Sequence, residues 1–377
     1  MNFDRTEEQE LLAASIARFV ERDYSFEARR RIVASPEGLS RDTWRTMADM
    51  GLLGLPLPAD YGGFGGGATD SMALMEAIGE ALIVEPWIAT VALGAQLVAR
   101  GGSESQKQRM LPDVAGGTRT MAFAHAEAGA RFELTHVVTR AIPHANVYVI
   151  NGAKRATAHA DAADTLIVSA RVAGADTDRN GIALFVVDRT TPGVSTQPLR
   201  MLDGTRAADI ALDNVRVPSD AALGTPGEGL SQIEQVVDFA TALVCAEAVG
   251  CIRSANAATL EYLKTRRQFG VPIGSFQALQ HRMVDLAIEY EQAKSMAYLA
   301  CAAVDGEHDT ARRARVVSAA KVRVADACRR VSQESVQLHG GMGMSDELKV
   351  SHTFRRLTAI AQQFGDADHH LARLATL

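Results

Sequence analysis

The segment TRRQFGVPIGSFQALQ, residues 265–280, divides the most strongly helical part of the chain. Before it, apolar residues recur at helical spacing from Ser231, where Ser-Gln-Ile-Glu also has the spacing of an N-terminal capping box. Within it, glycine and proline predict a turn rather than a continuing helix. Two more long helices are predicted over 276–304 and 312–338. Long helices joined by short links pack side by side, so residues 226–377 are predicted to form a four-helix bundle.

The middle of the chain, residues 119–225, has a different pattern. Short runs rich in valine, isoleucine and threonine replace the helical spacing, and turn dipeptides stand at Asn151-Gly152 and Asn180-Gly181. No helical stretch alternates with these runs, which argues against a Rossmann unit. The pattern instead predicts a small antiparallel β domain, either a sandwich or a barrel. The predicted strands lie at 147–151, 166–172, 182–187, 194–199 and 210–217.

The N-terminal part, residues 1–118, is predicted to be helical. Thr6 to Gln9 has a capping-box spacing, and residues 39–50 and 69–100 follow helical periodicity, the latter with an interruption at a proline. The proline- and glycine-rich stretch 55–67 predicts an ordered loop. The fold class is therefore α+β, with an all-α N-terminal domain, a middle antiparallel β domain and a C-terminal four-helix bundle.

Composition and charge restrict the functional classes. The chain has 377 residues, 47% hydrophobic and 22% charged, so it can bury a core without metal or disulfide support. The net charge of -6 leaves no basic surplus for binding nucleic acid. The N-terminus lacks the order of a signal peptide, and no uninterrupted apolar run reaches about 18 residues, so a cytoplasmic protein without a membrane span is expected. The cysteines form no CxxC pair, which argues against a zinc or redox site: Cys245, Cys251, Cys301 and Cys328.

Two motifs in the helical C-terminal part each allow a structural and a functional interpretation. Gly340-Gly341-Met342-Gly343 follows a predicted helix, so its glycines serve either a helix end or the close approach of a flat ligand. Arg266 stands at the other helix end. It is either a solvated cation near the negative end of the helix dipole or a ligand for an anionic diphosphate. Residue chemistry alone leaves both pairs of interpretations open.

Beyond these local arguments, four segments resemble the signatures of the acyl-CoA dehydrogenase family. TRRQFGVPIGSFQALQ is similar to R-x-QFG-x-P-I-x-x-FQ-x-x-Q, and QLHGGMGM to Q-x-x-GG-x-G. ADYGGFG resembles P-x-x-YGG-x-G, and NGAKRATAHADAADTLIVSAR matches the frame of NG-x-K-x-W-I-T-N. The likeness covers essentially the whole chain in order. The segments ASPEGLSRDTW, AEAVG and FGDADHHLARL more closely resemble the small subunit of bacterial pimeloyl-CoA dehydrogenase-type enzymes.

The resemblance implies a flavoprotein that removes two hydrogens from an acyl-CoA thioester. In the family, FAD lies between the β domain and the bundle, and a neighbouring subunit completes the site. A carboxylate removes the α proton while the β hydrogen leaves as hydride to the flavin. An electron-transfer protein then accepts the electrons, and the chain is expected to form a dimer or tetramer. Asp238 takes the position that binds the amide of the CoA arm. The residues implied to contact FAD, that of a partner subunit, are Arg266, Gln268, Phe269, Gln277, Gln337, Gly340 and Gly341.

The chain departs from the family pattern where the chemistry occurs. The usual base is the glutamate of Y-E-G-T, and that position holds Phe364; the alternative position on the bundle helix holds Ala240. Neither side chain accepts a proton. The flavin loop T-E-P-x-x-G-S-D is replaced by AEAGARFE at 126–133, and W-I-T by Ala-Thr-Ala at 156–158.

Three explanations of these departures follow. The first is a heteromeric dehydrogenase in which a paralogous large subunit carries the base, acting on a dicarboxylyl or otherwise bulky acyl-CoA. The second is another acid of this chain: Asp366, whose alternative role is the N-cap of a following helix, or Asp238, whose alternative role is a CoA or cap contact. The third is a non-catalytic binding or structural homologue. Among enzymes, an acyl-CoA oxidase or flavin monooxygenase is the alternative class.

Overall fold

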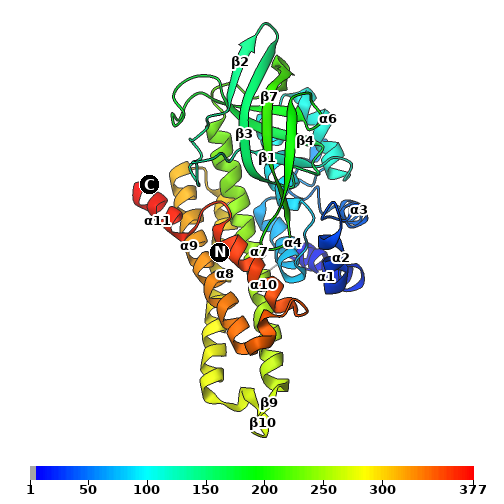
Figure 1. Cartoon of the computed structure of the whole chain (residues 1–377), viewed down its shortest axis with the longest axis vertical. Helices are drawn as coiled ribbons and strands as arrows, with labels where there is room; N and C mark the ends of the chain where they lie inside the picture. Colours follow the sequence, from blue (N-terminus) through cyan, green and yellow to red (C-terminus); the bar gives the residue numbers. More distant parts are fainter. Residues whose placement is uncertain (1–5) are drawn as a thin grey trace. The chain divides into compact units, whose positions relative to one another are not determined.

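The computed structural model describes residues 6–377. Residues 1–5, the start of the segment used to argue against a signal peptide, lie outside the described residues. Two compact units are formed from discontinuous stretches. The helical unit contains the chain up to Arg31, then Gly67–Ile83 and Thr241–Leu377, and the sheet unit contains Ile32–Gly66 and Val84–Ala240. Along the sequence, the predicted order of helices, β-strands and helices is confirmed (Figure 1).

The N-terminal helices begin with the predicted capping box. Thr6 Oγ1 accepts the Gln9 N–H at 3.2 Å, and Gln9 Oε1 accepts the Thr6 N–H at 3.1 Å. The predicted break near Pro86 is present, and the helix after it contains a π-helical stretch. The elements are α1 (Glu7–Asp23), α2 (Phe26–Ala34), α3 (Arg41–Asp49), η1 (Ala59–Tyr61), α4 (Ala68–Ala81), η2 (Ile88–Ala95), α5 (Gln96–Gly101) and α6 (Glu104–Ala115).

All five predicted strands are present in the sheet of this unit, and three further short strands of the same sheet were not predicted. The sheet has the order β6-β7-β3-β2-β4-β5-β8, with β1 paired to β4. Most neighbouring strands are antiparallel, as predicted. However, β1 and β2 each pair with β4 in parallel, so the prediction of a purely antiparallel domain was wrong. The strands are β1 (Met121–Ala124), β2 (Arg140–His144), β3 (Val147–Ala158), β4 (Thr165–Arg171), β5 (Ile182–Asp188), β6 (Val194–Arg200), β7 (Arg206–Pro218) and β8 (Ala222–Leu223).

The Asn151-Gly152 dipeptide is not a turn, contrary to the prediction. It lies inside β3, where the pairing with β7 shifts register between Ile150 and Gly152. A Cβ on Gly152 would stand 2.4 Å from Thr139 Oγ1 and 2.7 Å from Thr139 Cα, so only glycine fits this close approach of the two backbones. Asn151 Oδ1 accepts the Asn214 N–H at 2.8 Å, which occupies the side chain that would otherwise favour a turn.

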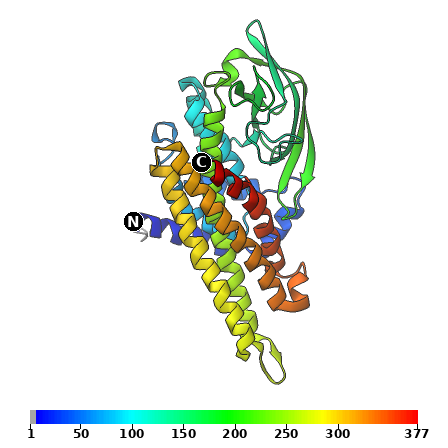
Figure 2. The same ribbon diagram turned by 90° about the vertical axis from the view of Figure 1, so that its left-hand side faces the viewer.

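The C-terminal helices form the predicted bundle, in which α8 and α9 run side by side (Figures 1 and 2). The helix α7 is long and apolar enough to span a membrane, but 94% of its most apolar window is buried, so it is a core helix. The four cysteines are buried as free thiols. The elements are η3 (Ser219–Ala221), α7 (Leu230–Thr265), β9 (Arg267–Gln268), β10 (Val271–Pro272), η4 (Ile273–Ser275), α8 (Gln277–Gly306), α9 (Thr310–His339), η5 (Gly340–Met344), α10 (Lys349–Gln362) and α11 (Ala367–Thr376).

Glycine permits a close helix crossing in the helical unit. A Cβ on Gly250 of α7 would lie 1.8 Å from the Glu76 carbonyl oxygen of α4, and a Cβ on Gly79 would lie 1.9 Å from the Glu247 carbonyl oxygen. The two backbones therefore touch, which larger residues would prevent. Beside this contact, the Cys251 thiol donates to the Gly79 carbonyl at 3.1 Å.

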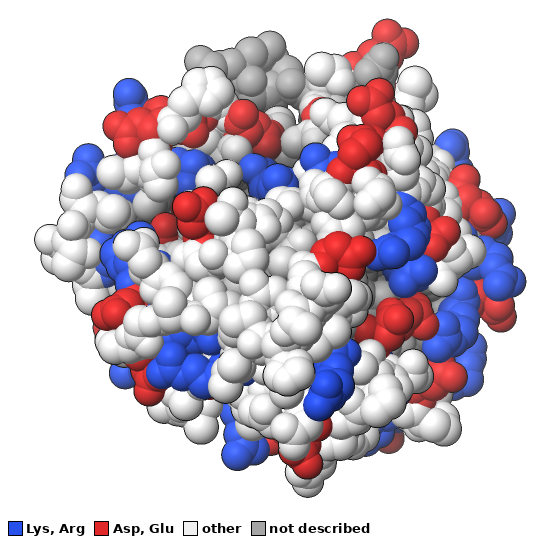
Figure 3. All heavy atoms as spheres, turned by 90° about the horizontal axis from the view of Figure 1, so that it is seen from above, with Lys and Arg blue, Asp and Glu red and all other residues white. Residues whose placement is uncertain are grey.

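Surface charge follows the small net charge of the chain. On the face drawn in Figure 3, Lys and Arg are interspersed with Asp and Glu around a largely uncharged centre. Opposite charges at such spacing partly cancel each other's field, so this face lacks a strong field of one sign.

Candidate functional site

The two C-terminal signature segments meet at one end of the bundle. The ring of Tyr262, in the last turn of α7, stacks on the ring of His339 at the end of α9, with centroids 4.5 Å apart and an interplanar angle of 29°. His339 Nδ1 is 2.7 Å from the Ser335 carbonyl oxygen, which fixes the ring. This aromatic contact brings together the C-terminal ends of α7 and α9, which lead to Arg266 and Gly340. Sequence spacing did not predict the contact.

The segment after α7 forms a small hairpin that presents an aromatic ring to solvent. Its strands β9 and β10 are antiparallel, and the Ile273 N–H closes the loop on the Arg266 carbonyl at 2.8 Å. Phe269 at the tip is 90% exposed and has φ of +53°, a conformation that costs a non-glycine residue about 1 kcal/mol. Its ring contacts that of Phe276 edge to face at 6.2 Å. An exposed, strained aromatic residue is typical of a binding site.

The three glycines after α9 lie in three different local environments. Gly340 ends the helix with φ of +60° and ψ of -145°, a conformation that favours glycine but is not the left-handed helical cap that the helix-end interpretation implies. Nothing lies within 4 Å of a Cβ built on Gly341, so its backbone is open to an approaching molecule. Gly343 is required by packing, because its Cβ would lie 2.5 Å from the Val336 carbonyl oxygen. Gly340 therefore ends the helix and Gly343 serves packing, while a ligand contact at Gly341 stays a prediction.

The predicted FAD contacts are suited to a nucleotide diphosphate. The Arg266 guanidinium has no hydrogen bond or ion pair to any residue in 6–377, so its donors are available for phosphate oxygens. Three exposed amides and an exposed aromatic ring are also among the predicted contacts. Every predicted contact is exposed within the single chain: Arg266, Gln268, Phe269, Gln277, Gln337, Gly340 and Gly341.

In the sheet unit, a buried ion pair supports the loop that the resemblance assigns to the flavin. Lys154 Nζ, fully buried, lies 2.6 Å from Glu127 Oε1 and donates to Ser169 Oγ at 2.9 Å. Glu127 Oε2 accepts the Val138 N–H at 2.6 Å, and Glu127 also accepts the Thr139 N–H. Burial lowers the pKa of Lys154 to about 8, although the Glu127 carboxylate opposes this. Sequence reasoning did not single out the pair, although Lys154 lies in a matched segment and Glu127 lies in the loop that departs from the family pattern.

The same loop keeps a glycine-like conformation without the glycine. Arg131, where the family has glycine, has φ of +50°, and its guanidinium lies 5.7 Å from the centroid of the Phe132 ring. Behind the loop, Ser169 Oγ accepts from Lys154 and contacts His125 Nδ1 at 2.9 Å. Burial, reinforced by Lys154, lowers the pKa of His125 to about 3, so the imidazole is neutral.

The segment that the resemblance aligns with the usual base position is held by several hydrogen bonds, and its aligned residue, Phe364, is not a carboxylate. Phe364 is half-buried with φ of +60°, and its carbonyl oxygen is 3.1 Å from His370 Nε2. The buried Lys321 Nζ donates to three carbonyls around this bend, including that of Gly365 at 2.8 Å. Asp366 Oδ1 accepts the His369 N–H at 2.8 Å and caps α11, the structural role that the sequence offered as an alternative.

Asp238 and Ala240, the two positions on α7 considered in the sequence analysis, lie in the sheet unit. Asp238 is 1% exposed and Ala240 is fully buried. Ala240 carries no titratable group, so it cannot accept a proton. Asp238 remains a predicted contact for the CoA arm.

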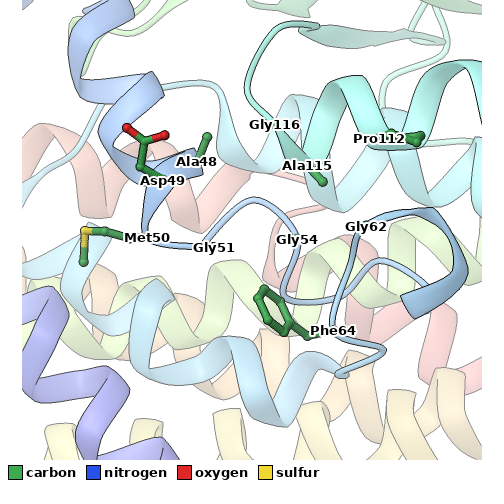
Figure 4. Close-up of a pocket in the computed structure, with 10 residues that line it drawn as sticks. All are labelled: Ala48, Asp49, Met50, Gly51, Gly54, Gly62, Phe64, Pro112, Ala115 and Gly116. Atoms are coloured by element: carbon green, nitrogen blue, oxygen red, sulfur yellow. The ribbon is translucent and has the colours of Figure 1, made fainter.

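The sheet unit contains a pocket whose lining includes none of the predicted site residues (Figure 4). Its volume is about 450 Å³. The ring of Phe64, which is 67% exposed, lies against the turn at Gly51 and forms part of its wall. The lining residues are Ala48, Asp49, Met50, Gly51, Gly54, Gly62, Phe64, Pro112, Ala115 and Gly116.

Comparisons with known proteins cover the whole chain. Residues 6–118, 122–215 and 227–376 match the N-terminal, middle and C-terminal domain models of acyl-CoA dehydrogenase. "Probable acyl-CoA dehydrogenase YngJ" of Bacillus subtilis is 33% identical, over 99% of this chain and 98% of that protein. The caffeyl-CoA reductase-Etf complex subunit CarC of Acetobacterium woodii is 29% identical, over 92% of each protein.

Among solved structures, the ChsE4-ChsE5 complex from Mycobacterium tuberculosis contains a chain with a TM-score of 0.90 and 25% identity, covering 100% of this chain and 98% of that one. The family thus includes members of heteromeric and Etf complexes. Domain matches along the entire length, with the same fold, lead to one conclusion: the chain belongs to the acyl-CoA dehydrogenase family of FAD-dependent oxidoreductases.

Proposed function

We propose that this chain is the subunit without a catalytic base in a heteromeric acyl-CoA dehydrogenase, whose paralogous large subunit supplies the missing carboxylate. One observation carries the proposal: the two base positions hold Phe364 and Ala240. The α proton of a thioester is weakly acidic, so its removal needs a positioned acceptor. A phenyl ring and a methyl group provide none.

The nearby acids support a base outside this chain. The Asp366 carboxylate accepts a backbone N–H at the start of α11, and a base would have to give up this cap. Asp238 is 1% exposed, which argues against repeated proton exchange with a bound substrate. These carboxylates therefore have structural or binding roles that do not require catalysis.

The bundle end gives this chain a role in such a complex. Arg266 would bind the diphosphate of a partner subunit's FAD, with Gln268 and Gln277 donating further hydrogen bonds and Phe269 packing on the adenosine. The open backbone at Gly341 would allow the nucleotide to approach α9 closely. When bound, FAD accepts the β hydrogen of the acyl group as hydride.

The substrate and partners follow from the resemblance. We infer a dicarboxylyl or otherwise bulky acyl-CoA, a cytoplasmic location and an electron-transfer protein as acceptor. Similarity to the ChsE4-ChsE5 complex supports a heteromer, and similarity to the Etf complex subunit CarC supports the acceptor. The small-subunit likeness to pimeloyl-CoA dehydrogenase-type enzymes supports the acyl class.

Co-expression with a paralogous dehydrogenase subunit encoded beside this chain tests the heteromer. We expect the two chains to co-purify and only the pair to reduce an artificial electron acceptor with acyl-CoA. Full turnover by this chain alone would refute the proposal. In that event Asp366→Asn and Asp238→Asn would identify the base. Assays with and without oxygen separate a dehydrogenase from an oxidase or monooxygenase.

A second experiment tests the FAD contacts. Arg266→Ala removes charge-assisted hydrogen bonds worth about 1.5–3 kcal/mol, so the complex should bind FAD about ten- to a hundredfold more weakly. Lys264→Ala, two residues earlier on the same exposed helix end, is the matched control and should leave FAD binding unchanged. Equal FAD content and affinity in both variants would contradict the assigned role of Arg266.

A further inference from the structure

A buried arginine connects three elements of the helical unit. Arg29 of α2 is 2% exposed, and its Nε donates to the Leu82 carbonyl, just after α4, at 2.8 Å. Its NH1 lies 3.0 Å from Nδ1 of His352 on α10. None of these residues belongs to a family signature segment considered above. A buried guanidinium is costly to desolvate, so its partners are specific.

The contacts of His352 determine its protonation state. A guanidinium has donors only, so Nδ1 must accept, and the proton of the neutral ring lies on Nε2. Nε2 lies 2.9 Å from the Asp346 carbonyl oxygen, to which it donates. The ring of Phe26 packs edge to face at 4.9 Å. Protonating Nδ1 would remove the acceptor and place a second cation against Arg29.

The charged groups around the ring favour this neutral form. Burial lowers the pKa of His352, and the cations Arg355 and Arg29 add to the effect, while Asp346 opposes it. Asp346 itself pairs with Arg355, which together with Arg30 holds the pKa of that carboxyl low. The imidazole is thus a neutral link between the donor on α2 and the acceptor at Asp346.

Asp346 connects this link to the glycine segment, defined as Gly340–Met344. It is the second residue after that segment, and the intervening Ser345 donates its N–H to the Met342 carbonyl at 3.0 Å. Ser345 Oγ accepts the Glu347 N–H at 3.2 Å. Nothing lies within 4 Å of a Cβ on Gly340 or Gly341, so the start of the segment is open, whereas its end packs on α9 at Gly343 and continues into Asp346.

We propose that Arg29 and His352 are positioning residues for the FAD site, which hold the glycine segment in its binding conformation through the backbone of Asp346. This inference rests on the proposed function, in which Gly340 and Gly341 contact FAD. Neither Arg29 nor His352 touches the cofactor in this arrangement. Their contribution is to restrict the backbone before FAD binds, which lowers the ordering cost of binding.

Two substitutions of His352 separate positioning from bulk. His352→Gln retains an oxygen that accepts from Arg29 and an amide N–H that donates to Asp346, whereas His352→Leu retains neither. We expect about five- to tenfold weaker FAD binding for His352→Leu, because one or two net hydrogen bonds are lost, and binding within about twofold of wild type for His352→Gln. His281→Leu, an exposed histidine on α8, is the control and should bind as wild type does.

The pH profile supplies a readout that loss of stability alone would not produce. With the wild-type complex, FAD affinity should fall as the pH drops below the ordinary histidine value of 6.5, because protonation breaks the Arg29 contact. With His352→Gln, this part of the pH dependence should be absent. Equal pH profiles for the two proteins would overturn the inference, and so would wild-type affinity in a folded His352→Leu. If His352→Leu does not fold, the His352→Gln profile decides.

The Arg266→Ala variant separates this inference from the function on which it rests. Loss of FAD in Arg266→Ala with wild-type behaviour in the His352 variants would overturn the positioning role alone. Full FAD retention in Arg266→Ala would instead contradict the proposed FAD contacts.

Discussion

Replacing Lys154 by methionine should strongly destabilise the sheet unit. The ammonium is fully buried and its partner Glu127 has a 4% exposed side chain, so the pair is separated from water. Lys154 also donates to Ser169 Oγ at 2.9 Å and to the His125 carbonyl at 3.3 Å, which uses all three of its protons. Methionine has a similar length and fills the space without supplying charge or donors.

The magnitude follows from what the substitution leaves behind. Breaking a buried ion pair from one side typically costs about 3–5 kcal/mol, because the remaining charge has no partner. Glu127 retains the N–H groups of Val138 and Thr139, so we expect the lower end, about 3 kcal/mol. The double variant Lys154→Met/Glu127→Gln removes the stranded charge while the amide oxygen still accepts these N–H groups. It should recover about half of the loss or more.

Urea unfolding followed by circular dichroism at neutral pH measures these differences. The matched control is Arg155→Met, the next residue, whose exposed pair with Asp209 should be worth about 0.5 kcal/mol or less. The reasoning is refuted if Lys154→Met costs no more than Arg155→Met. It is also refuted if the double variant is less stable than Lys154→Met, because the cost would then not arise from a stranded carboxylate.

Three further predictions concern the helical unit. Gly250→Ala should lower the free energy of unfolding by about 3 kcal/mol, because its Cβ would lie 1.8 Å from the Glu76 carbonyl oxygen and would push α4 away from α7. The control Gly306→Ala, where nothing lies within 4 Å of the added Cβ, should be neutral or stabilising. Equal thermal midpoints for the two variants would contradict this prediction. Burial lowers the pKa of His370 from 6.5 to about 3, so the unfolded chain binds a proton before the folded chain does, and the free energy of unfolding falls as the pH drops through this range. His370→Asn should reduce the slope of the free energy of unfolding against pH by up to about 1.4 kcal/mol per pH unit, measured by unfolding at a series of acid pH values. An unchanged slope would argue against a neutral, buried His370. Asp305 Oδ1 and Oδ2 accept the N–H groups of Ala68 and Thr69, at the start of α4, at 2.7 and 2.8 Å. Asp305→Ala should therefore lower the free energy of unfolding by about 1–2 kcal/mol. A change below about 0.3 kcal/mol would argue against this cap.

Periodicity predicted the elements well where one face of each is consistently buried. The long helices α8 and α9 lie within two residues of their predicted bounds, because their apolar spacing extends over many turns. The strand β1, with four residues, is too short for a pattern to distinguish it from loop. The turn prediction at Asn151-Gly152 was wrong because the pairing of β3 with β7 and the close approach of Thr139 to Gly152 override the local turn preference.

The candidate site was predicted unevenly. Linear motifs named Arg266 and the glycine segment, since each of these groups lies in a continuous stretch. The Lys154–Glu127 pair and the Arg29–His352 contact join residues that are 27 and 323 positions apart. A single sequence contains no measure of such proximity, so these contacts could not be found from spacing.

The amino-acid order by itself determined the family and the α+β class, and it placed no carboxylate at the two positions that the resemblance aligns with the usual base, because each of these depends on residue identity along a continuous stretch. Only the tertiary structure decided which glycine serves conformation, access or packing, and that Asp366 caps a helix. It also decided that two buried cations, Lys321 and Arg29, are bound mainly by backbone carbonyls and a neutral ring. These outcomes depend on which distant groups share the space around a side chain, and folding alone establishes that.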